Sequence, residues 1–159
     1  MAEENAGAAP GQDKQVGIQR MYLKDCSFES PKAPQIFQGE WKPEVKLNIS
    51  TQNARIELPA ETPGQVFDVT LTVEVDAQIE KETALLCEVK YAGIFYVAGF
   101  TDEELPAVLN SFCPTQLFPF AREAITDLVM KGGFPMIPIQ PINFDAMLAQ
   151  RQREAAGAH

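Results

Sequence analysis

The most regular feature of the sequence is a strict alternation of apolar and polar residues from Phe67 to Ala77. The apolar positions are Phe67, Val69, Leu71, Val73, Val75 and Ala77, and Asp, Thr or Glu stands between them. Successive side chains of a strand point to opposite faces, so the segment predicts a strand with one buried and one wet face. A sheet built on such a strand needs a second layer over its apolar face.

Three further segments predict strands, at residues 16–29, 44–49 and 83–97. In the first of them, one parity collects Val16, Ile18, Tyr22, Cys26 and Phe28, and the other collects Gln19, Asp25, Ser27 and Glu29. We therefore expect the second set to lie on a polar face. Four strands with short connections predict an antiparallel sheet.

Helical signals follow the last predicted strand. Thr101 and Glu104 have the spacing of a capping box, which predicts a helix start. Apolar residues keep helical spacing through residues 118–129, until a Gly-Gly pair ends the pattern. Because Pro114 and Pro119 interrupt this region, we expect a long helix that is bent or broken.

Prolines recur at every third position between residues 134 and 142, which favours extended backbone. Asn143 is a suitable N-cap for a final short helix that carries Phe144, Met147 and Leu148. The predicted fold class is therefore α+β, with a four-stranded antiparallel sheet followed by a long helix and a short C-terminal helix.

The length of 159 residues suits one domain. Residues 1–14 are small and polar, and we expect a disordered N-terminal leader there. Residues 15–150 form the single predicted domain, and residues 151–159 are expected to be a flexible C-terminal tail.

The chain is acidic, with 22 Asp and Glu against 13 Lys and Arg and a net charge of −9. Such a surface repels phosphate backbones, so nucleic acid is not an expected partner. It attracts basic segments, although acidity also serves solubility alone. The N-terminus lacks a secretion signal, and the longest charge-free apolar run, residues 91–100, is half of what a membrane helix needs. We expect a cytoplasmic protein that does not insert into membranes.

The sequence offers little for catalysis. The single histidine is the terminal His159, so neither a Ser-His nor a Cys-His pair is expected, and no phosphate-binding loop is present. The three cysteines are Cys26, Cys87 and Cys113. Their spacing fits neither zinc nor a redox pair, and we interpret them as reduced, packed thiols. A small acid–base enzyme using Asp25 or Glu88 is the remaining catalytic alternative, and we predict neither enzyme nor cofactor.

Large apolar side chains also stand outside the regular strands. Phe37 and Trp41 lie in or after a proline-containing loop, and Phe144 and Met147 lie on the final helix. Such residues are usually core, but their placement on a loop and a terminal helix leaves a hydrophobic groove as an alternative. The apolar excess also predicts self-association.

Several blocks of sequence resemble SecB, the bacterial protein-export chaperone family. They are Lys24-Asp-Cys-Ser-Phe-Glu, Trp41-Lys-Pro-Glu-Val-Lys-Leu, Glu82-Thr-Ala-Leu-Leu-Cys-Glu-Val, Gly93-Ile-Phe, Cys113-Pro, Leu117-Phe-Pro-Phe-Ala-Arg-Glu and Pro141-Ile-Asn-Phe-Asp-Ala. The blocks occur in order over residues 18–148, with one insertion around residues 56–64. The resemblance implies a cytosolic holdase that keeps precursor proteins unfolded and passes them to the SecA motor. It also implies a homotetramer, a dimer of dimers, that uses no cofactor.

The resemblance also assigns residues to three surfaces. The client-peptide groove is implied for Phe37, Trp41, Ile142, Phe144, Met147 and Leu148. An acidic face for the C-terminal zinc-binding segment of SecA is implied for Asp25, Glu29 and Glu88. The tetramer interface is implied for Cys87, Val89 and Tyr91.

Two features depart from the family pattern, namely Tyr91 and the basic tail Arg151-Gln-Arg153. The runner-up interpretation is a SecB-like chaperone dedicated to a toxin–antitoxin system. The acidic face, which such chaperones usually lack, favours the export chaperone.

Overall fold

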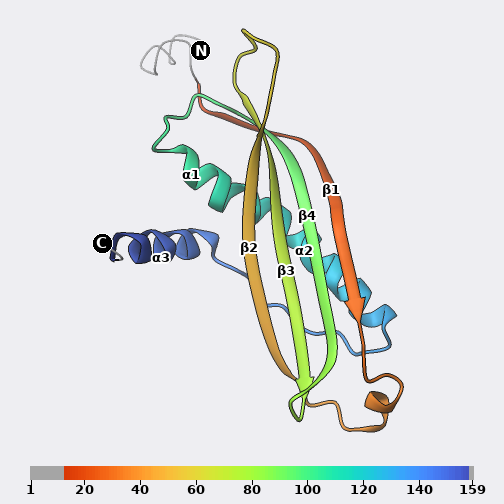
Figure 1. Ribbon diagram of the computed structural model, residues 1–159. Coiled ribbons are helices and arrows are strands. Elements are labelled where there is room, and N and C mark those ends of the chain that lie inside the picture. Colours follow the sequence, from red (N-terminus) through yellow and green to blue (C-terminus); the bar gives the residue numbers. More distant parts are fainter. Residues whose placement is uncertain (1–12, 158–159) are drawn as a thin grey trace.

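The computed structural model describes residues 13–157 and contains one sheet with a long helical run on one side of it (Figure 1). The elements are β1 (Gln15–Glu29), a 3-10 turn (Gln35–Gln38), β2 (Glu44–Ile56), β3 (Gln65–Ile79), β4 (Glu82–Ala98), α1 (Leu105–Ala107), a π-helical turn (Val108–Phe112), α2 (Cys113–Lys131) and α3 (Phe144–Gly157). This arrangement confirms the predicted α+β class. The predicted leader lies outside the described residues, except for its last two.

The four strands are antiparallel and lie in the order β1-β4-β3-β2. β3 and β4 are joined by the two-residue turn Glu80–Lys81, in which φ is 52° and 70°. Positive φ at both positions gives the type I′ geometry whose twist matches the flanking strands. β1 and β2 are therefore the two edge strands.

β1 departs from the simple alternation because it contains two bulges. Its pairing with β4 shifts between Ile18 and Arg20 and again between Leu23 and Asp25. Each extra residue reverses the parity of the side chains after it. The first bulge therefore turns Tyr22 away from the helices and Met21 toward them, and the second restores the original parity. The predicted position of Tyr22 on the apolar face was wrong for this reason.

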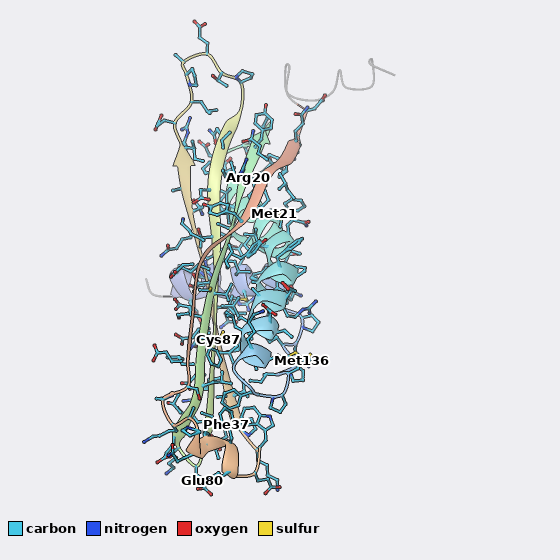
Figure 2. All side chains as sticks on the ribbon, turned by 90° about the vertical axis from the view of Figure 1, so that its right-hand side faces the viewer. Arg20, Met21, Phe37, Glu80, Cys87 and Met136 are labelled. Atoms are coloured by element: carbon cyan, nitrogen blue, oxygen red, sulfur yellow. The ribbon has the colours of Figure 1, made fainter. Side chains whose placement is uncertain are left out.

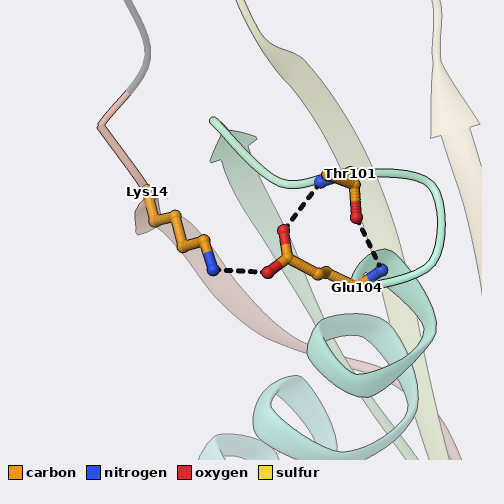
Figure 3. Close-up of polar contacts among 3 residues, drawn as sticks. All are labelled: Lys14, Thr101 and Glu104. Carbon is orange, nitrogen blue, oxygen red and sulfur yellow. Dashed lines mark hydrogen bonds and ion pairs between the residues drawn. The ribbon is translucent and has the colours of Figure 1, made fainter. Parts of the chain in front are cut away.

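The capping box at the start of the helical region is confirmed (Figure 3). The Thr101 N–H donates to Glu104 Oε1 at 2.9 Å, and the Glu104 N–H donates to Thr101 Oγ1 at 3.2 Å. Lys14 forms an ion pair with the other oxygen of Glu104 and ties the start of β1 to this cap. The contact with Lys14, together with the Thr101 hydrogen bonds, lowers the pKa of the Glu104 carboxyl.

From Leu105 the chain remains helical up to Lys131, through one π-helical turn. In that turn the Cys113 N–H donates to the Val108 carbonyl oxygen, five residues back. The turn lies immediately before Pro114, which has no N–H to donate and whose ring crowds the preceding turn. The predicted break is therefore a local widening of one continuous helical run.

α2 packs against β4 and β3 and covers the apolar face of the sheet. Val69, Leu71, Val73 and Val75 of the alternating strand are fully buried under it. Close approach is possible because Gly93 has no side chain, and a Cβ there would lie 3.1 Å from Leu117. The opposite face of the sheet has no helix over it in Figure 1, and we call it the open face.

Beyond α2 the chain is extended from residue 134 to residue 143 and then enters α3, which projects past β2 (Figure 1). Asn143 Oδ1 accepts the Ala146 N–H at 2.9 Å, as its predicted N-cap role requires. The helix continues to Gly157, so the expected flexible tail is helical through residues 151–157. A Gln150–Glu154 hydrogen bond of 2.9 Å, one turn apart, supports this longer helix.

Candidate functional site

Three aromatic rings surround the buried Phe134 at the end of the sheet that carries the Glu80 turn. The ring of Phe37 lies 5.0 Å from that of Phe134 between centroids, Trp41 lies at 5.3 Å, and Phe28 lies at 6.3 Å. We call this group the aromatic cluster. Phe37 keeps 48% of its surface exposed, and Figure 2 shows it at the same end of the molecule as Glu80.

The cluster brings together segments that are far apart in the sequence. Phe28 is the last residue but one of β1, and Phe37 belongs to the 3-10 turn. Trp41 precedes β2, and Phe134 follows the Gly-Gly pair after α2. Sequence reasoning identified Phe37 and Trp41 but missed the central position of Phe134. The signal for it was present, because Phe134 directly follows the helix stop and begins the proline-rich segment.

The predicted groove residues of the C-terminal region lie elsewhere. Phe144 is 2% exposed and packs on Phe118, with 6.0 Å between ring centroids. Ile142, Met147 and Leu148 are half-buried. Because α3 projects beside β2 while the 3-10 turn lies at the hairpin end (Figure 1), one chain does not bring Phe144 and Phe37 together. Within one chain the ring of Phe144 fills the core rather than lining an open surface, and its groove assignment stays a prediction.

The extended segment after Phe134 borders an open hollow of about 410 Å³ against α2. Its lining residues are Pro119, Arg122, Glu123, Thr126, Met136, Ile137, Pro138 and Ile139. Met136 is 56% exposed at its edge, whereas Ile137 is 6% exposed. Figure 2 shows Met136 beside the lower part of α2. The sequence predicted only extended backbone for this segment and gave no sign of the hollow.

The predicted acidic residues do share the open face. Asp25 is the cross-strand partner of Lys90, and Ser27 is the partner of Glu88, so Asp25, Glu29 and Glu88 project on the same side. Glu74 of β3 lies directly opposite Glu88 and extends this group. Two like charges facing each other disfavour the sheet and favour a cation that binds over them.

Cys87 and Val89 point toward α2 and have no exposed surface within one chain. Within one chain these two side chains belong to the core under α2, and their implied place in the tetramer interface stays a prediction. Tyr91, on the same face, stacks on Phe120 with 5.7 Å between centroids and remains half-exposed.

Around Tyr91 lies a set of exposed apolar side chains. They are Ile18, Leu23, Phe112 and Phe120, with exposed fractions between 44% and 48%. Leu23 is the strand partner of Tyr91, and Phe112 and Phe120 are two helical turns apart on one side of the helix. We call Tyr91 and these four residues the apolar strip.

The structure holds no obvious centre for metal chemistry within residues 13–157, since no group of three or more His, Cys, Asp or Glu side chains is placed to bind an ion. Burial raises the pKa of the Cys87 thiol to about 11 and that of the Cys113 thiol to about 12. Both thiols are therefore protonated and packed, as predicted. The prediction of a packed thiol was wrong for Cys26, which is exposed on edge strand β1. No helix among the described residues is both long and apolar enough to cross a bilayer.

Comparison with known proteins gives a consistent result. A curated protein-export protein SecB of Nitrosococcus oceani is 47% identical over 165 aligned positions, which cover 99% of this chain and 97% of that protein. Among solved structures, a Mycobacterium tuberculosis SecB-like chaperone in complex with a ChAD peptide from the HigA1 antitoxin matches with a TM-score of 0.58. That match has 18% identity and covers 81% of this chain and 88% of the other, so it shows the shared fold.

The family model described as preprotein translocase subunit SecB matches residues 9–155. Together with the near full-length relative, this match shows that the chain belongs to the SecB family.

Proposed function

We propose that this protein is a cytoplasmic holdase that binds unfolded precursor proteins and delivers them to SecA for export. The observation that carries the proposal is the aromatic cluster. In this cluster the ring of Phe37 contacts the buried Phe134, yet about half of the Phe37 surface is exposed. A folded protein gains by covering such a ring, and an unfolded client supplies apolar side chains that do so. The protein acts by binding, without catalysis or a cofactor.

Client binding is distributed over several small surfaces. Covering one aromatic side chain stabilises a complex by about 2 kcal/mol, which alone is too little for tight capture. The aromatic cluster and the hollow beside Met136 are joined by the extended segment that starts at Phe134. An extended client that contacts both surfaces gains from linked binding. Flexible Met136 and flat aromatic rings suit clients of many sequences.

The acidic residues of the open face are the proposed SecA contact. Asp25, Glu29, Glu74 and Glu88 attract a basic segment such as the C-terminal zinc-binding segment of SecA. This attraction raises the association rate and weakens with salt. Because the acidic residues and the aromatic cluster occupy different surfaces, client and SecA can bind together.

The apolar strip is the proposed contact between subunits of a homotetramer, a dimer of dimers. A small monomer rarely leaves two phenylalanines and two branched aliphatic side chains exposed in one region. Covering them with the equivalent strip of a second chain gives a two-fold contact. Tyr91 and Phe120 lie in the strip, whereas Cys87 supports it from the core.

The decisive experiment measures capture of an unfolded precursor by the Phe37→Ala/Met136→Ala double variant. We expect at least about tenfold weaker capture, because two exposed apolar contacts are truncated. The matched control is Met130→Ala, which removes an equally exposed methionine that is not a lining residue of the hollow. Equal capture by both variants would exclude the proposed client surface.

A role in a toxin–antitoxin system is the alternative proposal. It predicts capture of one cognate antitoxin segment and no binding of SecA, so a SecA binding measurement separates the two functions.

A further inference from the structure

The position of the second bulge in β1 decides to which face Asp25 points. Leu23 pairs with Tyr91 and Asp25 pairs with Lys90, so Lys24 is the extra residue between them. With the bulge at this position, Asp25 projects on the open face.

A bulge two residues later would give a different surface. If Cys26 were the extra residue, Asp25 would move to the helix side of the sheet, opposite Val89, and Ser27 would keep its pairing with Glu88. The present Cys26 position at the sheet edge is exposed, so a carboxylate there would meet no large burial penalty. The burial cost of Asp25 therefore does not decide between the two bulge positions.

Packing at the end of β1 does not supply that interaction. The ring of Phe28 packs on Phe134 and lies where a Cβ of Gly132 would be, 2.1 Å from it. This contact fixes Phe28 on the helix side. However, Phe28 stays on that side in both arrangements, so its packing leaves the face of Asp25 undetermined.

Lys24 itself makes a set of polar contacts at the bulge. Its Nζ lies 2.9 Å from Asp68 Oδ2 and 3.2 Å from Thr70 Oγ1, and Tyr22 Oη donates to Asp68 Oδ1 at 2.8 Å. These side chains reach from β1 to β3 across β4, where the intervening partner of Tyr22 and Thr70 is the small Ala92. We call Tyr22, Lys24, Asp68 and Thr70 the clamp.

We propose that Lys24 is a positioning residue for SecA binding, because its ion pair with Asp68 holds the second bulge and so keeps Asp25 on the open face. The inference rests on the proposed function, of which it specifies one step. Charge alone predicts the opposite effect, since a lysine on an acidic face weakens the attraction of a basic segment. The direction of the effect in a Lys24 variant therefore separates positioning from electrostatics.

The test measures binding of the zinc-loaded C-terminal segment of SecA at low salt to the intact assembly. The variant is Lys24→Met, and its matched control is Lys46→Met, which removes the same charge. Lys46 is exposed on the open face, opposite Asp76, and has no ion pair within residues 13–157. We expect Lys46→Met to bind as well as the unaltered protein or better. We expect Lys24→Met to bind more weakly by up to about fivefold, because the loss of a partly exposed ion pair shifts the bulge equilibrium by at most about that factor.

Two further variants keep the test independent of any folding defect. Lys24→Arg retains the cation and is expected to restore binding to within about twofold of the unaltered protein. Asp68→Asn breaks the same pair from the other side and is expected to weaken binding more than Asp76→Asn, which removes an equal charge from the same strand and face. A crystal structure of Lys24→Met is expected to show Asp25 no longer opposite Lys90.

The outcomes separate the two levels of the proposal. If the unaltered protein does not bind the SecA segment, the proposed delivery to SecA is excluded, and with it the role of Lys24. If the unaltered protein binds while the Lys24 and Lys46 variants bind alike, the delivery proposal stands and the positioning role is refuted.

Discussion

Substitution of Gly132 by alanine tests whether the end of α2 and the end of β1 are packed as tightly as the structure shows. A Cβ at this position would lie 2.1, 2.6 and 3.0 Å from three ring carbons of Phe28, well inside van der Waals contact. The backbone at Gly132 has φ −74° and ψ −2°, which alanine adopts without strain. The whole cost therefore comes from displacing the Phe28 ring.

Overpacking of this kind lowers the free energy of unfolding by about 1–3 kcal/mol. Replacing glycine by alanine also raises it by about 0.4–1 kcal/mol, because the unfolded chain loses conformational entropy. We expect a net loss of about 1–2 kcal/mol, or a fall of about 2–8 °C in Tm for a chain of this length. Gly39→Ala is the matched control, since nothing lies within 4 Å of its Cβ position and its backbone is extended. We expect the control to be neutral or slightly stabilising.

Urea unfolding at one fixed protomer concentration measures both variants, because association also contributes to stability. The same substitution is then made in a Phe28→Ala background, where the ring is absent. We expect the cost of Gly132→Ala to fall by at least about 1 kcal/mol there, which is the coupling energy between the two positions. An equal cost in both backgrounds would refute the assigned contact with Phe28.

Three further predictions concern separate parts of the molecule. Glu88→Lys should weaken SecA binding at low salt while client capture is unchanged, and equal affinity for SecA would contradict the acidic contact. Alkylation of the folded protein at pH 8, read by mass spectrometry, should modify Cys26 and spare Cys87 and Cys113, whose pKa values burial raises to about 11 and about 12; early labelling of either would contradict their packing. Thr101→Ala should cost about 1 kcal/mol in urea unfolding through the lost cap, and an unchanged midpoint would show that the capping box adds no stability.

Features with a regular local signature could be predicted from the sequence. The alternation from Phe67 to Ala77 corresponds to β3, because a strand with one buried face leaves a period of two in its own residues. The capping box at Thr101 is equally local. The acidic residues Asp25 and Glu88 were placed on one face correctly, since the two bulges of β1 cancel before Asp25 is reached.

Features that depend on distant partners could not be predicted in the same way. The first bulge turns the Tyr22 side chain to the other face of the sheet, and a bulge leaves no periodic pattern in the sequence. The hydrogen bond of Tyr22 to Asp68 also depends on a residue of another strand. Phe144 has the same local context as a groove residue and is buried because Phe118 of α2 lies over it. Cys87 likewise is a core residue because the helix covers its side of the sheet. For Phe144 and Cys87, a helix that packs over the side chain decides how much of it is exposed, and the local sequence does not specify that contact.

α3 is anchored to the rest of the protein at its N-terminal end only. In its first two turns Phe144 packs against Phe118, Asp145 accepts a hydrogen bond from Ser111, and Met147 packs against the core. Every residue from 150 to 157 is exposed. A helix of 14 residues is about 21 Å long, so a tilt of about ten degrees at the anchored end displaces the other end by about 4 Å. A tilt of α3 about the Phe118–Phe144 contact would therefore move the exposed residues 150–157 much further than it moves the anchored end.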